Sequence, residues 1–374
     1  MARYKMSDVV TEVNERENNP ANSKYDRFVG LEHYVSGEVI IRNYGSTERL
    51  ESTMKVFQAG DILVARRNVY LKRASTVDFD GLTSGDSIVL RAKDPEIGRI
   101  LPFVLNTDSF WDFADQYSDG TMSKRLSPKT LMTFEFDLPD GNELSKLADI
   151  LWAANDTRES YQALLKQADE LVKSQFIELF GDYKTNSKNW PVATFSEFAK
   201  IDANMTTDYM FYADYPHIGI DSIEKDTGVL SGFRTVKEDN VISGKYVFTP
   251  KHIIYSKIRP NLNKVALPSF DGLCSADAYP ILPNSNNCNR LYLAVLLRSE
   301  YFLDYILGFS ARSNMPKVNR KQVEGFTAPL PPIALQEQFA NFYEQLDKSK
   351  FELKLAIANI SEMMKSLIQQ DFSN

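Results

Sequence analysis

Cysteine and histidine are scarce in this chain, with two and three copies among 374 residues. Two cysteines cannot build a disulfide framework, and no cysteine pair or histidine cluster has the spacing of zinc ligands. The longest apolar run, residues 291–297, is far shorter than the ~20 residues of a membrane span. No apolar signal-peptide region follows Met1. We therefore expect a soluble, cytoplasmic protein with reduced thiols.

Motifs for nucleotide binding and hydrolysis are also absent. The sequence holds no GxxxxGK[ST] phosphate loop, no GxGxxG after a strand-like run and no GxSxG elbow. A nuclease-like set of Asp347, Glu352 and Lys354 falls within one continuous predicted helix, where such residues are typical of polar faces. These observations predict that the chain itself has no catalytic residues, metal site or cofactor.

The length of the chain indicates its number of domains, and its net charge excludes one class of nucleic-acid-binding protein. A chain of 374 residues is expected to hold about two domains of ~150 residues each. The apolar fraction of 43% is that of an ordinary globular protein. The net charge of -7 excludes a basic protein that coats nucleic acid through bulk charge, although local basic patches stay compatible with it.

An internal repeat organises the chain. Residues 79–86 (FDGLTSGD) recur as residues 270–277 (FDGLCSAD), an offset of 191. Further patches recur in the same order at nearly the same offset, which indicates a duplication of about half the chain. These patches are residues 28–32 with 217–221, 61–66 with 252–257, 122–124 with 315–317, and 172–174 with 364–366.

Each half has the same two-part pattern. Short apolar runs separated by Gly, Pro, Asn and Asp predict mixed strands and short helices, and a long helical stretch follows a proline break. The predicted fold class is therefore α+β, with two similar mixed α/β domains and two long helices. The predicted domains are residues 1–140 and 183–332, and the predicted helices are residues 141–182 and 333–374.

Both predicted long helices carry apolar residues that alternate three and four apart, the heptad pattern of a coiled coil. Narrow seams of this kind, one in each half, favour two helices that pair with each other. The alternative is that each helix is buried on its own domain. The seam of the first half contains Leu144, Leu147, Leu151, Ala154, Tyr161, Leu165, Ala168, Val172 and Leu179, with Arg158 and Gln175 in the remaining slots, and that of the second contains Leu335, Phe339, Phe342, Leu346, Ser349, Leu353, Ala356, Ile360, Met363 and Leu367.

Basic side chains gather at equivalent places in the two halves. Residues 61–74 sum to +3 and residues 251–264 to +4, whereas residues 143–182 hold eight acids against four bases. Lys and Arg neutralise DNA phosphates, and Arg, Lys and Asn contact base edges, so these segments predict binding to double-stranded DNA. The alternative is a pair of solvated charged loops, which recurrence in both halves disfavours. The candidate DNA-binding residues are Arg66, Arg67, Asn68, Lys72, Arg73, Lys124 and Arg125 in the first half, and Lys257, Arg259, Asn261, Lys264, Arg312, Lys317 and Arg320 in the second.

Further motifs accompany the duplication. They are residues 28–33 (FVGLEH) with the counterpart 218–221 (IGID), residues 174–182 (SQFIELFGD), residues 329–338 (PLPPIALQEQ), and residues 190–192 (WPV) with 195–198 (FSEF). Together with the duplication, these motifs resemble the specificity subunits of type I restriction-modification systems, and the resemblance spans the whole chain.

The resemblance implies a non-catalytic subunit that recognises a bipartite DNA site, with one half-site for each target recognition domain. It also implies that the two long helices pack as an antiparallel coiled coil in a pseudo-two-fold repeat. About 38 helical residues at ~1.5 Å each span roughly 57 Å, enough to space half-sites about 34–36 Å apart. The implied partners are methylation subunits, of which we expect two, and restriction subunits, which would carry S-adenosylmethionine, ATP and Mg.

Two other functional classes stay open on the sequence alone. One is an enzyme, namely a stand-alone DNA methyltransferase or nuclease. The other is a helical scaffold that has no role with nucleic acid.

Overall fold

The computed structural model describes residues 2–120, 123–309 and 316–372. The chain divides into two compact units, Met1–Leu164 with Leu353–Asn374 (unit 1) and Leu165–Glu352 (unit 2). The long helices α5 (Asn142–Phe180) and α10 (Ile333–Phe372) each contribute one stretch to each unit. Every core described below lies within a single unit.

Unit 1 begins with the globular part of the first repeat. Its elements are β1 (Ala2–Lys5), α1 (Met6–Val9), β2 (Val10–Glu12), β3 (Arg16–Glu17), η1 (Pro20–Asn22), β4 (Arg27–Val29), η2 (Leu31–His33), β5 (Gly45–Ser46), β6 (Met54–Phe57), β7 (Ile62–Ala65), η3 (Val69–Leu71), β8 (Ala74–Thr76), β9 (Gly81–Thr83), β10 (Ser87–Ala92), α2 (Pro95–Val104), α3 (Asp108–Gln116), α4 (Pro128–Leu131) and β11 (Glu135–Leu138), where η denotes a 3-10 helix.

Unit 2 holds the globular part of the second repeat. Its elements are β12 (Val192–Thr194), α6 (Phe195–Phe198), β13 (Ala199–Ile201), β14 (Met205–Thr206), β15 (Pro216–Ile218), η4 (Ile220–Ser222), β16 (Arg234–Thr235), β17 (Lys245–Phe248), β18 (Ile253–Ser256), η5 (Pro260–Leu262), β19 (Val265–Ala266), β20 (Gly272–Cys274), β21 (Ala278–Pro283), α7 (Arg290–Arg298), α8 (Glu300–Leu307), α9 (Arg320–Glu324) and β22 (Thr327–Pro329).

The two repeats have the same sheet topology, strand for strand. The four-stranded sheet has the order β2-β10-β7-β8 in the first repeat and β13-β21-β18-β19 in the second. The five-stranded sheets, β3-β6-β9-β4-β5 and β14-β17-β20-β15-β16, and the two-stranded sheets, β1-β11 and β12-β22, correspond in the same way. The predicted α+β fold class with an internal repeat is therefore confirmed.

Strand registers repeat as well. The pair Ser87↔Ala65 in β10·β7 recurs as Ala278↔Ser256 in β21·β18, with both residues moved by 191. Each five-stranded sheet has one parallel pair, β4·β9 and β15·β20, among antiparallel ones. A one-residue change of register would turn every side chain to the other face, so matching registers place equivalent side chains on equivalent faces.

Local sequence explains several of these elements. The runs ILVA in β7 and IIYS in β18 are buried at every position, as expected for short, nearly continuous apolar strands. Helix N-termini are capped by small polar side chains that accept backbone N–H bonds, for example Asp94 for α2 and Asn289 for α7. Thr107 caps α3 and Ser299 caps α8 in the same way.

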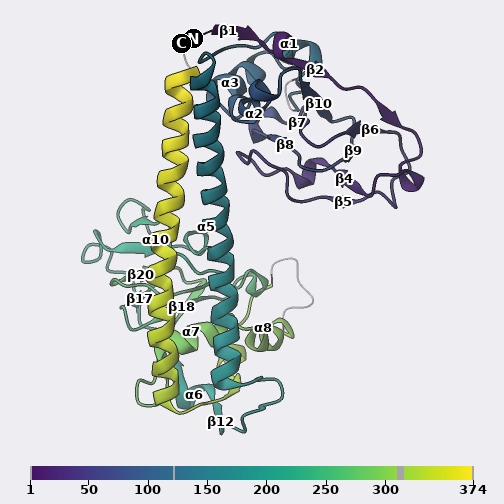
Figure 1. Cartoon of the computed structure of the whole chain (residues 1–374). Coiled ribbons are helices and arrows are strands. Elements are labelled where there is room, and N and C mark those ends of the chain that lie inside the picture. Colours follow the sequence, from purple (N-terminus) through teal and green to yellow (C-terminus); the bar gives the residue numbers. More distant parts are fainter. Residues whose placement is uncertain (1, 121–122, 310–315, 373–374) are drawn as a thin grey trace. The chain divides into compact units, whose positions relative to one another are not determined.

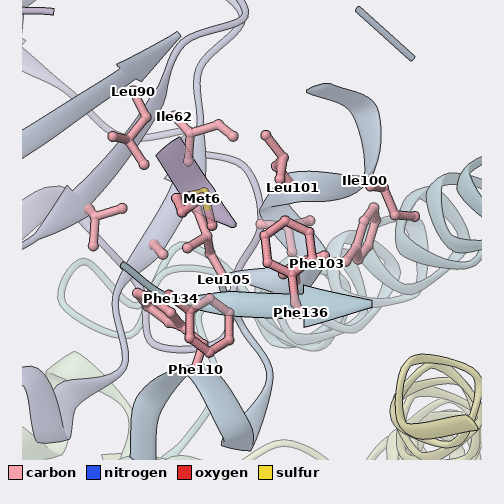
Figure 2. Close-up of a cluster of buried hydrophobic side chains, with 14 of the residues drawn as sticks. Met6, Ile62, Leu90, Ile100, Leu101, Phe103, Leu105, Phe110, Phe134 and Phe136 are labelled. Atoms are coloured by element: carbon pink, nitrogen blue, oxygen red, sulfur yellow. The ribbon is translucent and has the colours of Figure 1, made fainter. Parts of the chain in front are cut away.

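The core of unit 1 joins the four-stranded sheet to α2, α3 and both long helices. Figure 2 shows Ile62 and Leu90 from the sheet with Leu101, Phe103 and other buried side chains of this cluster. The cluster also includes Leu144, Leu147, Ala148, Leu151 and Ala154 of α5, and Met364 of α10.

The core of unit 2 is rich in aromatic rings. Phe176 and Phe180 of α5 pack against Phe339 of α10, with ring centroids 5.5 Å apart in both cases. Tyr292 of α7 stacks on Phe176 at 5.9 Å, and its hydroxyl lies 2.5 Å from that of Tyr183. Phe339 is fully buried, so this group of rings joins the helix pair to the globular part of the unit.

The long helices run antiparallel in each unit (Figure 1). In unit 1 the start of α5 shares a core with the end of α10, and in unit 2 the end of α5 contacts the start of α10. The ion pair between Asp169 and Lys350, with a 2.5 Å separation, adds a contact in unit 2. The predicted antiparallel pair is therefore confirmed, and the alternative that each helix is buried on its own domain is wrong, because both helices contribute to each core.

The buried seam departs from the strict heptad near one end of each helix. Met364 is buried, whereas the predicted seam residue Met363 is 45% exposed. Phe176 is likewise buried beside the predicted slot of Gln175. The reason is geometric, because an α-helix repeats every 3.6 residues and drifts by about 20° per heptad from a strict three-four pattern.

The sequence also yields predictions about membrane spans and about the two cysteines. Among the described residues, no helix combines the length and apolar character needed to cross a membrane. Cys274 and Cys288 are free thiols in buried positions, and burial raises the pKa of each to about 12.

The aromatic contact between the helices yields a stability prediction. Phe339→Ala removes a fully buried ring that packs on Phe176 and Phe180. We expect a loss of about 3–5 kcal/mol in the free energy of unfolding, because transfer and cavity terms add. Urea denaturation followed by circular dichroism measures this loss.

Phe351→Ala is the matched control, since Phe351 lies on the same helix and is 68% exposed. Its unfolding should change by no more than about 0.5 kcal/mol. Equal losses for the two variants would contradict the assigned packing of α10.

Candidate nucleic-acid interface

The predicted basic segments form the same short turn in both repeats. In the first, β7 is followed by residues 66–73, which contain η3, and in the second β18 is followed by residues 257–264, which contain η5. We call these the first turn and the second turn. Each connects two antiparallel strands, β7 to β8 and β18 to β19, and the second strand of each pair lies at the edge of its four-stranded sheet.

Each turn contains two residues whose backbone is in the left-handed conformation. Asn68 and Lys72 have φ of 54° and 47°, and the equivalent Arg259 and Asn263 have φ of 47° and 48°. Only the two asparagines belong to a residue type that adopts this region readily, since a β-carbon crowds the backbone there by about 1–2 kcal/mol per residue. The same unfavourable conformation at equivalent positions shows that this turn shape is a property of the fold.

Backbone hydrogen bonds tie each turn to the second predicted basic segment. The Asn68 N–H donates to the Lys124 carbonyl at 2.9 Å, and the Arg259 N–H donates to the Pro316 carbonyl at 2.7 Å. The Leu126 N–H and the Val318 N–H return bonds to the carbonyls of residues 66 and 257. The structure therefore brings together the basic segments that the sequence singled out separately.

A carboxylate lies among the basic groups of each repeat. Asp86 is within 3.0 Å of Arg67 Nε and 3.1 Å of Arg125 Nη2. Its equivalent Asp277 is 2.9 Å from Lys317 Nζ. These acids hold the neighbouring cations in place and reduce the local excess of positive charge.

Sequence reasoning missed both acids as members of the site. The signal was available, since Asp86 and Asp277 close the duplicated motifs 79–86 and 270–277.

Burial and a neighbouring cation both act on the first basic residue of each turn. Burial and the nearby charge of Arg125 lower the pKa of the Arg66 guanidinium. Burial and the nearby charge of Lys317 lower the pKa of the Lys257 ammonium, which also lies 5.0 Å from the ring centre of Tyr279. In both cases burial is the larger cause and the neighbouring cation the smaller one.

Several candidates donate side-chain hydrogen bonds inside their own domain, and the first of them, Arg66, donates from Nε to the Leu126 carbonyl at 3.2 Å. Arg73 donates from Nη1 to the Leu31 carbonyl and from Nη2 to the Arg67 carbonyl, each at 3.0 Å. The equivalent Lys264 donates to the Ile220 carbonyl at 2.9 Å. Leu31 and Ile220 are the first residues of η2 and η4, so these side chains link the turn to the same place in each repeat.

The remaining candidates are at the surface. Lys72 pairs with Asp108 at 2.6 Å, and this contact lowers the pKa of the Asp108 carboxyl. Lys124 pairs with Asp115 at 2.5 Å, and Arg320 with Glu324 at 2.7 Å. Arg259 and Asn261 are exposed, and Arg312 lies outside the described residues.

The structure also bears on the catalytic alternative. Asp347, Glu352 and Lys354 are all exposed along α10 rather than gathered around one point. Within residues 2–120, 123–309 and 316–372, no group of three or more His, Cys, Asp or Glu side chains is arranged to hold a metal ion.

Comparison with known proteins finds a matching family model and a similar protein. Residues 187–360 match the model of the family described as the type I restriction modification DNA specificity domain. The EcoDI specificity subunit of Escherichia coli, a type I restriction enzyme subunit, is 33% identical over 191 residues, which are 49% of this chain. The match spans only 41% of that relative's length.

A solved structure covers more of the molecule. The S subunit of a type I restriction-modification system from M. genitalium aligns over 100% of this chain and 96% of its own, with a TM-score of 0.62. The sequence identity is 14%, so this match establishes the fold.

The second repeat thus matches the model of a DNA specificity domain, and the first repeat has the same strand order in all three sheets. These similarities confirm the resemblance of the chain's motifs to the specificity subunits of type I restriction-modification systems.

The inward-facing cations give a prediction about stability. Arg73→Met leaves the Leu31 carbonyl without its donor, so we expect it to lower the free energy of unfolding by about 1–3 kcal/mol. Lys264→Met removes one of two donors to the Ile220 carbonyl, which still accepts the Ile223 N–H, so we expect a smaller loss of about 0.5–1.5 kcal/mol. Urea denaturation of the purified chain measures the change, and Lys251→Met, at an exposed lysine that precedes β18, is the control. Unaltered unfolding together with weakened DNA binding would instead assign these charges to DNA.

Proposed function

We propose that the chain recognises a bipartite site on double-stranded DNA, with one half-site bound by each repeat. The observation that carries this proposal is the basic turn built twice in the same backbone form, each time tied to a second basic segment. Affinity for DNA comes from cations that neutralise phosphates. The family's DNA specificity domain supports the same conclusion.

The proposed first interface consists of Arg66, Arg67, Asn68, Lys72, Arg73, Lys124 and Arg125. The second consists of Lys257, Arg259, Asn261, Lys264, Arg312, Lys317 and Arg320. Since Arg73 and Lys264 bind carbonyls of their own domain, we assign them to shaping the turn and the other cations to contacting DNA.

We further propose that the chain catalyses no reaction itself. It would act in the cytoplasm by presenting DNA to methylation subunits, of which we expect two, and to restriction subunits. Those partners would bind S-adenosylmethionine, ATP and Mg. The E. coli relative supports this role, because it is described as the specificity subunit of a type I restriction enzyme.

The alternative of a stand-alone DNA methyltransferase or nuclease has a direct test. Transfer of labelled methyl groups from S-adenosylmethionine to DNA by the purified chain, or cleavage of DNA by it, would favour that alternative. Failure of the chain to bind DNA even with methylation subunits present would favour a purely structural scaffold.

The DNA-binding assignment predicts a loss confined to one half-site. Arg67→Gln with Arg125→Gln should lower affinity and reduce the slope of log affinity against log salt by about one for each phosphate that is no longer neutralised. Sequence preference at the first half-site should disappear while the second half-site keeps its own. Fluorescence anisotropy on the complex co-expressed with methylation subunits measures affinity over a salt series.

Arg3→Gln provides the control, because Arg3 is an exposed arginine of unit 1 that pairs with Glu135 on β11. The mirror variant, Arg259→Gln with Lys317→Gln, should affect only the second half-site. Full affinity and specificity in both double variants would refute the assignment.

We also propose that the paired helices set the gap between the half-sites. Each helix contributes a stretch to the core of each unit, so its length joins the two repeats through buried contacts. A helix lengthens by ~1.5 Å per residue, and seven residues preserve the heptad seam.

A heptad insertion tests the spacer. Seven residues inserted after Leu164 in α5 and after Glu352 in α10, the unit boundaries, should lengthen the preferred gap by about three base pairs, from ~10.5 Å of added helix. Mapping of methylated positions on a library with varied gaps measures the preference. An insertion of the same length in the exposed loop after Glu51 should leave the gap unchanged. An unchanged gap in the helix variant would mean that the helices do not set it.

A further inference from the structure

The two turns share a backbone but differ at their tips. η3 has the sequence Val-Tyr-Leu and η5 has Pro-Asn-Leu, so Tyr70 of the first repeat corresponds to Asn261 of the second. In both turns the first residue is buried and the middle residue is exposed. Equivalent backbone thus presents two chemically different side chains at one position.

The tip side chains are free to contact a ligand. From the sequence, a single aromatic residue such as Tyr70 is expected to be buried in a hydrophobic core. In the structure, the Tyr70 side chain is instead 65% exposed. Neither Tyr70 nor Asn261 makes a side-chain hydrogen bond with any residue that the structure describes. By contrast, Arg67, Arg125 and Lys317 are each paired with a carboxylate.

The turns are also held rigidly. In each, the residue after the tip donates its N–H to the carbonyl of the left-handed residue two positions before the tip, at 2.9 Å in both repeats. Further bonds fix that left-handed residue to residue 124 or 316. A position held by its own domain and flanked by cations suits base contact, because phosphate contacts position a protein whereas base contacts specify the sequence.

The position of each turn in its four-stranded sheet is compatible with base contact. Each turn joins two antiparallel strands, β7 with β8 or β18 with β19, and the second strand is the edge strand of a four-stranded sheet. A turn at a sheet edge can approach a DNA groove, and in the major groove an asparagine amide forms two hydrogen bonds with adenine.

We infer that residues 70 and 261 are specificity-determining positions that contact base edges, and that Asn261 selects an adenine in the second half-site. The inference rests on the proposed DNA-recognition function and adds to it the residue that distinguishes one half-site from the other. Tyr70, which lacks an amide, selects a different base pattern at the equivalent place in the first half-site.

Exchange of the tips tests the inference. The complex of the chain with its methylation subunits is presented with randomised duplex DNA, and bound sequences are determined for wild type, Asn261→Tyr and Tyr70→Asn. Asn261→Tyr should reduce the preference for adenine at one position of the second half-site by about 5- to 150-fold, the discrimination that one bidentate amide–adenine pair provides. Tyr70→Asn should raise adenine at the equivalent position of the first half-site.

A nearly isosteric variant guards against misfolding. Asn261→Asp keeps the shape of an exposed side chain but replaces the amide with acceptors, so the preferred base should change from adenine to cytosine. In all three variants the other half-site should be unchanged. Thermal unfolding confirms that each variant is folded.

Two controls have the residue types of the tips and are likewise exposed. Tyr44→Asn replaces an exposed tyrosine of unit 1, and Asn286→Tyr replaces an exposed asparagine of unit 2. Neither should alter base preference.

The possible outcomes distinguish failure of this inference from failure of the proposed DNA-recognition function. If wild type selects no bipartite site, the proposed function itself fails. If wild type selects a bipartite site and the tip variants keep its base preferences, or the controls change the same positions, the inference is overturned.

Discussion

Burial of the long helices completes both hydrophobic cores. Unit 1 uses Leu147 and Leu151 from α5 with Met364 from α10, and unit 2 uses Phe176 from α5 with Phe339 from α10. The globular part of each repeat therefore lacks part of its core unless both helices are in place. For unit 1 the missing part comes from the C-terminal end of the chain, so its core is completed only after the second repeat has been synthesised. Closing so long a loop costs entropy, which the apolar seam must outweigh.

Comparison of the two repeats distinguishes hydrogen bonds that maintain the fold from exposed side chains that are free to differ. A hydrogen bond from a backbone N–H to a side chain recurs even where that side chain differs between the repeats. Asp61 accepts the Gln58 N–H at 2.8 Å, and at the equivalent position His252 accepts the Thr249 N–H through Nδ1 at 3.0 Å. Different residues thus maintain one turn in both repeats. Exposed positions carry no such constraint, so the two copies can present different chemistry from one scaffold.

Electrostatics works locally in this acidic chain. The net charge of -7 is compatible with a DNA-binding surface because acids and bases are segregated along the sequence. Asp86 and Asp277 then moderate each basic cluster from within. Exposed ion pairs of this kind add little stability. Their effect is to restrict the orientation of cations that would otherwise be mobile.

The sequence by itself determined the duplication, the α+β class, the two long helices and the basic segments. Each of these follows from composition or from periodicity over neighbouring residues, which a linear chain displays directly. The resemblance of its motifs to a known family was also visible without coordinates.

Only the tertiary structure decided which basic side chains are bound to carbonyls of their own domain. Arg73 and Lys264 look like any other cations in the sequence, yet carbonyls about 40 residues away bind them. The same holds for Met364, whose burial follows from helix drift and from the partner helix rather than from its neighbours in the chain. Hydrogen bonds and packing between distant segments set these outcomes, and no local pattern encodes them.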